Sequence, residues 1–132
     1  MSRLLFILLF VAVVIVAWAF KSSTKSSVYK TVGADEFERI ISDTAGVVVL
    51  DARTLSEYDE GHIAHAVLID VKTDSFMMAA RDLLPKDKTI AVYCRSGRRS
   101  AMAADMLTDE GYTVVNLDGG IMAWIQSGKS VE

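Results

Sequence analysis

The sequence is poor in the residues that form crosslinks or hold metal ions. Its 132 residues include one cysteine, Cys94, and two histidines, His62 and His65. A single cysteine cannot form an internal disulfide, which is compatible with a reducing compartment. Two histidines without further cysteine or histidine near them fall short of a zinc-binding set. We therefore expect neither a metal nor another cofactor.

The chain also lacks an excess of positive charge. It has 14 lysines and arginines against 17 aspartates and glutamates, and its formal net charge is −3. Proteins that bind nucleic acid through a general electrostatic surface are usually basic, so we expect no nucleic-acid partner. The length of the chain leaves room for one domain.

One long apolar run stands near the N-terminus. Residues 4–20, LLFILLFVAVVIVAWAF, contain no polar side chain. As a helix they would span about 25 Å, which is at the short end of what crosses a bilayer. We interpret residues 1–20 as an N-terminal hydrophobic helix that serves as a transmembrane anchor. The alternative is a signal peptide, because residues 17–19 place two alanines around a tryptophan as a cleavage site requires.

The next residues indicate a tether and an orientation. Residues 21–30, KSSTKSSVYK, are polar and serine-rich, as in a flexible linker. Three lysines lie in this tether, whereas only Arg3 and the terminal amine precede the apolar run, so the domain is expected on the cytoplasmic side. We expect a single-pass protein of a bacterial-type inner membrane. Cleavage of a signal peptide would instead export the domain to the periplasm.

Short apolar segments alternate with helical patterns along the rest of the chain. The expected strands are residues 47–51, 66–70, 89–93 and 113–117, and the expected helices lie within 34–42, 54–62, 75–84, 100–110 and 120–128. Strands that alternate with helices predict an α/β fold with a small, mainly parallel sheet and helices on both faces. We expect this domain to cover residues 31–130.

A polar residue follows or ends each expected strand. These residues are Asp51, Asp70, Cys94 and Asp118. In an open parallel sheet, binding and catalytic sites form at the carboxyl ends of the strands. A cysteine that only filled the core would lie within an apolar run, whereas Cys94 lies at the exit of one. We therefore expect Cys94 to be the catalytic residue.

The loop after Cys94 is small and basic. It reads Arg95, Ser96, Gly97, Arg98, Arg99 and Ser100. If a helix begins near its end, the amides of 95–100 turn inward and form an anion-binding nest above the positive end of the helix dipole. Gly97 permits the positive φ that closes such a turn. Amides and arginines both favour the thiolate, so a lowered pKa of the thiol is expected; the alternative is a solvated basic turn beside an incidental thiol.

The spacing of the loop separates two chemistries. Four residues stand between Cys94 and Arg99, whereas the protein-tyrosine-phosphatase pattern has five. A shorter ring of amides suits one sulfur atom with a delocalised negative charge better than a phosphoryl group. The loop therefore favours a persulfide, in which the thiolate takes the outer sulfur of a donor and holds it as Cys–S–S⁻.

Three motifs together resemble the single-domain rhodanese family. They are DARTLSEYDEGHI at 51–63, YCRSGRRSA at 93–101 and NLDGGIMAW at 116–124. The resemblance implies a five-stranded parallel sheet and sulfurtransferase activity through a persulfide on Cys94. It also implies a small anionic sulfur donor such as thiosulfate. The acceptor, a thiol, cyanide or a protein, must be external because the chain has no second cysteine.

The resemblance also assigns the site residues. Cys94 would carry the sulfur, and residues 95–100 would stabilise the persulfide and attract the donor. Asp51 and Arg53 resemble the family's acid–base pair near the site, and Asp118 with the two following glycines resembles a turn that supports the loop. His65 departs from the family, which usually has glycine there, and we expect it to narrow or polarise the site entrance.

Three other functions stay open at this point. One is a persulfide carrier that delivers sulfur to a membrane-associated protein partner through the membrane segment at 4–20. Another is an anion-binding module without catalysis. The third is a phosphate or arsenate enzyme of related fold.

Overall fold

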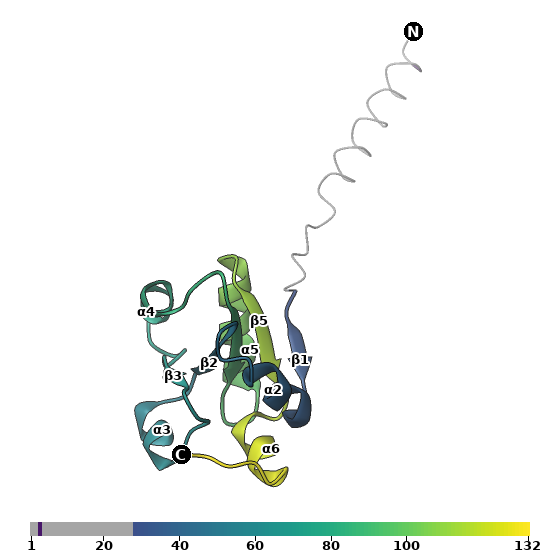
Figure 1. Ribbon diagram of the computed structural model, residues 1–132. Coiled ribbons are helices and arrows are strands. Elements are labelled where there is room, and N and C mark those ends of the chain that lie inside the picture. The colour runs from purple at the N-terminus through teal and green to yellow at the C-terminus, as the bar shows by residue number, and fades with distance from the viewer. Residues whose placement is uncertain (1–2, 4–27) are drawn as a thin grey trace.

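The computed structural model describes residue 3 and residues 28–132 of the chain (Figure 1). The expected membrane segment at 4–20, and most of the expected tether at 21–30, lie outside the described residues. Within the described part, no helix has the length and apolar character needed to cross a membrane.

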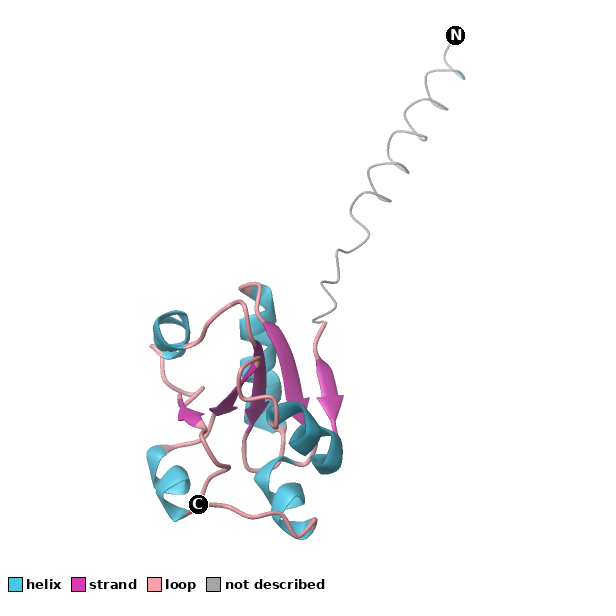
Figure 2. Cartoon of the chain, viewed as in Figure 1, coloured by secondary structure: helices cyan, strands magenta, loops and turns pink. Residues whose placement is uncertain are grey.

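One parallel sheet of five strands forms the centre of the domain (Figure 2). The strands are β1 (Lys30–Val32), β2 (Val47–Asp51), β3 (Val67–Leu68), β4 (Thr89–Tyr93) and β5 (Thr113–Leu117). Their order across the sheet is β1-β5-β4-β2-β3, and every pairing is parallel. The central strand β4 pairs with β2 along its whole length, so that Asp51 lies beside Tyr93. The parallel sheet is confirmed, and its strands end at one common edge.

Residues 28–132 contain five helices, and four of them pack on the two faces of the sheet (Figure 1). The five helices are α2 (Ala34–Ile41), α3 (Leu55–Glu60), α4 (Phe76–Leu83), α5 (Arg98–Asp109) and α6 (Gly120–Gln126). Successive side chains of a strand point to opposite faces. Ile90 and Val92 of β4 accordingly pack in a core cluster with α4 and α5. Ala91 and Tyr93 pack in a second cluster with α2 and α6, so helices on both faces are confirmed.

Two edge strands differ from the expectation. Lys30, expected at the end of the tether, begins β1, and two of the three residues of this strand are exposed. Because this strand is short and polar, it lacks the run of apolar residues from which the other strands are predicted. The strand expected at 66–70 is only Val67–Leu68, because Asp70 belongs to a turn in which its carboxylate accepts a hydrogen bond from the backbone amide of Lys72.

The helix starts follow local capping chemistry. The backbone amide of Glu57 donates to the Thr54 hydroxyl, and the Glu57 carboxylate accepts from the backbone amide of Thr54, which completes the expected capping box of α3. Helix α5 begins at Arg98, two residues before the expected start at 100, because Gly97 is its N-cap with φ +106°. The helix dipole of α5 therefore begins closer to Cys94 than expected.

Candidate active site

Strand β4 places Cys94 at the floor of a loop that leads into α5. Cys94 is the first residue after the strand and is 1% exposed. Its Sγ accepts a hydrogen bond from the backbone amide of Gly97 at 3.1 Å and one from the Ser100 hydroxyl at 3.3 Å. The donors of the loop thus converge on the sulfur from the side of the helix N-terminus.

These donors set the protonation of the thiol. Burial by itself raises the pKa of Cys94. The Ser100 hydroxyl and the amides of Ser100, Gly97 and Ser96 oppose burial, and the net result is a lowered pKa. The thiolate is therefore stabilised mainly by neutral dipoles. The arginines, which the sequence suggested as a further cause, contribute less than these donors.

Helix α6 supports the loop from the opposite side. The amide of Ile121 donates to the Cys94 carbonyl at 2.8 Å, and the amide of Met122 donates to the Arg95 carbonyl at 3.2 Å. Gly120 allows this approach, because a Cβ atom there would lie 2.5 Å from the Cys94 carbonyl oxygen. The side chain of Asp118 is exposed, so the support comes from Gly120 and the amides after it and not from the Asp118 carboxylate.

The arginines of the loop fall into two kinds. Arg99 forms a two-pronged ion pair with Glu57 of α3, with N–O distances of 2.7 and 2.8 Å. This pair raises the pKa of Arg99 and lowers the pKa of Glu57 to about 2. Arg95 and Arg98 are exposed, and their side chains have no hydrogen-bond or ion-pair partner in the part of the chain that the structure describes. The uncompensated positive charge at the loop therefore comes from Arg95 and Arg98.

Asp51 and Arg53 form a buried ion pair behind the loop. The guanidinium of Arg53 donates to Asp51 at 2.6 Å and to the Gly61 carbonyl at 2.8 Å. The Tyr93 hydroxyl also donates to Asp51, at 2.6 Å, and burial together with this carboxylate raises the pKa of Tyr93. Because Tyr93 precedes Cys94, the pair fixes the end of β4. Neither Asp51 nor Arg53 forms a hydrogen bond with the sulfur, so these two residues support the position of the loop.

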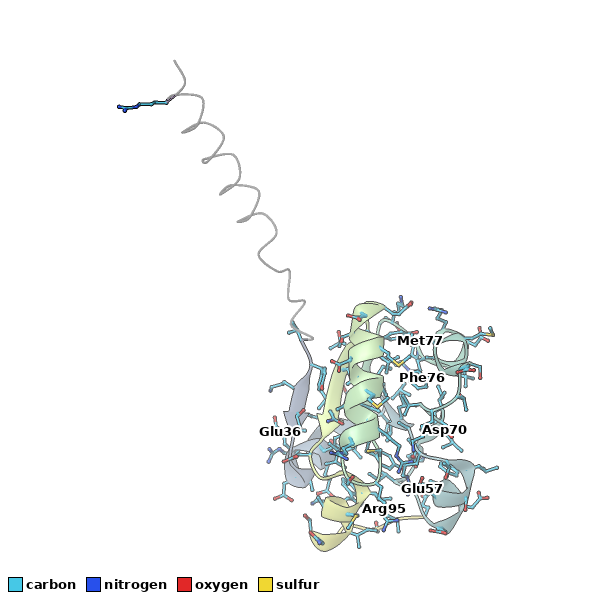
Figure 3. All side chains as sticks on the ribbon, turned by 180° about the vertical axis from the view of Figure 1, so that it is seen from behind. Glu36, Glu57, Asp70, Phe76, Met77 and Arg95 are labelled. Atoms are coloured by element: carbon cyan, nitrogen blue, oxygen red, sulfur yellow. The ribbon has the colours of Figure 1, made fainter. Side chains whose placement is uncertain are left out.

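A pocket of about 240 Å³ opens beside the loop. It is lined by Arg53, Glu57, Glu60, Gly61, Arg95, Ile121, Met122, Ile125 and Val131. Figure 3 shows Glu57 and Arg95 at the same end of the molecule, away from Phe76 and Met77. The sequence did not identify Glu57, Glu60 and Tyr93 as site residues. Glu57 and Glu60 lie within the motif at 51–63, but only the fold shows that this motif meets the loop.

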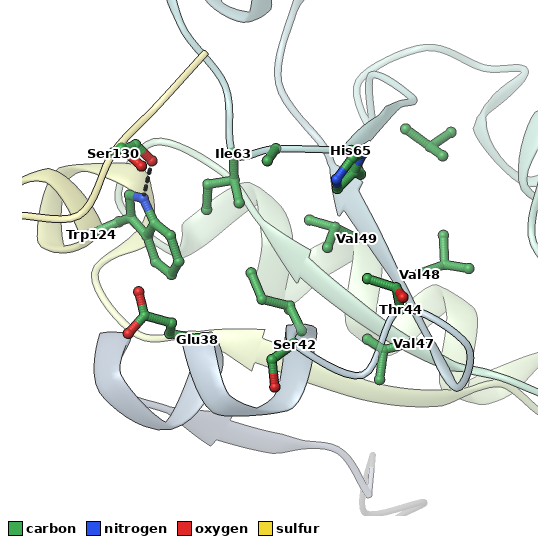
Figure 4. A pocket seen from close by; sticks show the side chains of 13 residues that line it. Glu38, Ser42, Thr44, Val47, Val48, Val49, Ile63, His65, Trp124 and Ser130 are labelled. Atoms are coloured by element: carbon green, nitrogen blue, oxygen red, sulfur yellow. Dashed lines mark hydrogen bonds between the residues drawn. The ribbon is translucent and has the colours of Figure 1, made fainter.

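His65 lies in a different place from the one expected. It lines a second pocket, of about 670 Å³, with residues of α2 and β2 and with Trp124 (Figure 4). None of residues 94–100 lines this pocket, so the expectation that His65 narrows the site entrance is wrong. Its φ is +65°, the one positive value at a non-glycine residue in the described part. Glycine adopts such a φ without strain, which explains why the family usually has glycine there.

Comparison with known proteins agrees with the fold. The family model of the rhodanese-like domain matches residues 33–127 of this chain. A sulfurtransferase of Allochromatium vinosum is 35% identical over 98 residues, which cover 74% of this chain and 89% of that protein. A putative sulfurtransferase of Bacillus subtilis, YtwF, is 37% identical over 87 residues, 66% of this chain and 81% of that protein.

A solved structure has the same fold. The crystal structure of a rhodanese-related protein from Thermoplasma volcanium superposes with a TM-score of 0.69 at 33% sequence identity. The match covers 79% of this chain and 98% of that protein. The chain therefore belongs to the rhodanese-like family of sulfurtransferases.

Proposed function

We propose that this protein moves a sulfane sulfur from thiosulfate, or from a persulfide donor, to a thiophilic acceptor through a persulfide on Cys94. The observation that carries the proposal is the convergence of the Gly97 amide and the Ser100 hydroxyl on Sγ. Such donors stabilise the thiolate before the reaction and a terminal persulfide sulfur, which also bears negative charge, after it.

The first step loads the enzyme. The Cys94 thiolate attacks the outer sulfur of thiosulfate, a new S–S bond forms, and the old S–S bond breaks with its electron pair on the departing sulfite. The low exposure of Cys94 suits a donor that presents a single terminal sulfur. Arg95 and Arg98, whose charges are uncompensated, attract the dianionic donor to the loop.

The second step unloads the enzyme. A thiolate or cyanide acceptor attacks the terminal sulfur of the Cys94 persulfide, and the S–S bond breaks with its electron pair on Cys94. The thiolate is thereby restored and stabilised again by Gly97 and Ser100. No external oxidant or reductant is needed, because the transferred sulfur keeps its oxidation level from donor to acceptor.

Mass spectrometry of the full chain tests the proposal. After incubation with thiosulfate and removal of the excess, the chain gains the mass of one sulfur atom at Cys94, and added cyanide removes it. The Cys94→Ser variant gains nothing. Ser127→Ala, whose hydroxyl bonds only within α6, serves as the control and is loaded like the unchanged chain.

Two results would contradict the proposal. One is a chain that stays unmodified at Cys94 under these conditions. The other is hydrolysis of an aryl phosphate faster than sulfur transfer from thiosulfate, which would point to the phosphate chemistry left open by the sequence. Against that chemistry, Arg99 is held by both oxygens of Glu57 and is not free to bind a phosphoryl group.

A further inference from the structure

A pocket of about 240 Å³ lies beside the loop, and Arg95 is its one lining residue with a part in the proposed loading of Cys94. Its walls come from α3, from α6 and the C-terminal segment, and from Arg95. The amides of Ile121 and Met122, whose residues line it, hold the carbonyls of Cys94 and Arg95. The pocket is therefore fixed to the backbone of the residue that carries the sulfur.

The charges around the pocket leave one cation and one anion free. Two arginines and two glutamates line it. Arg53 is neutralised by Asp51, and Glu57 by Arg99. Arg95 and Glu60 remain, and neither side chain has a hydrogen-bond or ion-pair partner among residues 28–132. A pocket with one free charge of each sign matches a zwitterion better than a dianion such as thiosulfate.

The residues that line the rest of the pocket restrict the size and the polarity of a bound molecule. Four apolar residues complete the walls: Ile121, Met122, Ile125 and Val131. They suit a small molecule that has an apolar part between its charged groups. A volume of about 240 Å³ corresponds to roughly eight water-sized groups, and a small amino acid is of this size.

We infer that this pocket binds the sulfur acceptor, and that the acceptor is a small amino-acid thiol of the cysteine class. Its carboxylate pairs with Arg95, its ammonium pairs with Glu60, and its thiol reaches the persulfide on the neighbouring Cys94. The inference rests on the proposed persulfide and goes beyond it by naming the acceptor and the residues that select it.

The transfer balances without another reactant. The acceptor thiolate attacks the outer sulfur of the Cys94 persulfide, Cys–S–S⁻, and a new S–S bond forms. The bond between the two sulfurs of the persulfide breaks with its electron pair on Cys94, which becomes the thiolate. The product is the persulfide anion of the acceptor, so that charge is conserved without a proton transfer.

The test measures unloading alone. The full chain is loaded with thiosulfate, the excess is removed, and loss of the sulfur mass from Cys94 is followed after addition of one thiol. Cysteine carries both charges, N-acetylcysteine only the carboxylate, cysteamine only the ammonium, and 2-mercaptoethanol neither. Rates are compared at equal thiolate concentrations, well below saturation. We expect cysteine to react fastest.

Two variants test the contributions of Glu60 and Arg95 to binding separately. Glu60→Gln lowers the rate ratio of cysteine to N-acetylcysteine by about three- to fivefold, the size of a partly exposed ion pair. Arg95→Gln lowers the ratio of cysteine to cysteamine by a similar factor. Asp59→Asn removes the same charge as Glu60→Gln from the adjacent, exposed residue, which does not line the pocket, and leaves both ratios unchanged.

The outcomes separate the two proposals. An unmodified Cys94 before any thiol is added overturns the proposed function, and the inference falls with it. A loaded Cys94 that reacts equally with all four thiols overturns the inference alone. The same holds if the two ratios in Glu60→Gln and Arg95→Gln equal those of the unchanged chain, or if unloading requires a protein acceptor.

Discussion

At the scale of single residues, the hydroxyl of Ser100 is the strongest of the donors that lower the pKa of Cys94. It is fully buried and also contacts the Gly97 carbonyl, so its position is fixed. The sequence offered only a small polar residue at the end of the loop. Its role depends on the start of α5, which brings residue 100 back over the sulfur.

Replacing this hydroxyl changes the titration of the thiol. In Ser100→Ala the pKa of Cys94 rises, because burial keeps disfavouring the thiolate while its strongest donor is lost. Loading by thiosulfate at neutral pH slows by about fivefold, which is the effect of one hydrogen bond. The pH dependence of alkylation by iodoacetamide measures the pKa. Ser127→Ala is the control, and an unshifted profile in Ser100→Ala would show that the hydroxyl is incidental.

Glu57 acts at the same scale through its charge. Its pKa of about 2 in the folded chain lies below the ordinary 4.5, chiefly because of Arg99. A carboxyl with a lowered folded pKa stabilises the fold fully above its ordinary pKa and loses this contribution as pH falls through the folded value. The ion pair is therefore intact at neutral pH and fails in acid.

Glu57→Gln makes this contribution measurable. Glutamine keeps the capping box of α3 but not the charge. At pH 7 the variant is less stable to urea by about 1 kcal/mol, given that both side chains are partly exposed. The difference from the unchanged chain shrinks as pH falls from 4.5 towards 2. Asp59→Asn gives no such pattern, and a difference that is constant over this range would contradict the assignment.

At the scale of elements, α6 and the loop after β4 are joined by backbone contacts that require a residue without a side chain. Gly120 has φ +61°, and a Cβ atom there would overlap the carbonyl groups of Cys94 and Arg95. Gly128, at the end of α6, has φ +77° but open space around it. Substitutions at the two glycines therefore distinguish the cost of backbone strain from the cost of steric overlap.

Alanine at these two positions is expected to have unequal effects. Gly128→Ala costs about 1–2 kcal/mol through the left-handed backbone alone. Gly120→Ala costs more, about 3 kcal/mol or above, because the loop must also move. The midpoints of urea unfolding compare the two. Gly120→Ala also slows thiosulfate loading of Cys94, and equal stability of both variants would show that the close approach is unimportant.

At the scale of the whole molecule, the apolar run at 4–20 leads to a prediction about where the protein is found in the cell. We propose that it anchors the protein in the membrane, on the strength of its apolar length alone. The full chain expressed in bacteria is then expected in the membrane fraction, resistant to a carbonate wash. A chain without residues 1–27 is expected in the soluble fraction. A mature N-terminus near residue 20 would instead indicate a cleaved signal peptide.

The sequence by itself determined the fold class and the candidate nucleophile. The apolar runs of β2, β4 and β5 are local features, and so is the place of Cys94 between an apolar strand and a glycine-containing basic loop. Only the tertiary structure decided that Arg99 pairs with Glu57, that Gly120 rests against Cys94, and that His65 faces another pocket. These contacts join residues far apart in the chain, and a local pattern carries no information on which distant segment will meet it.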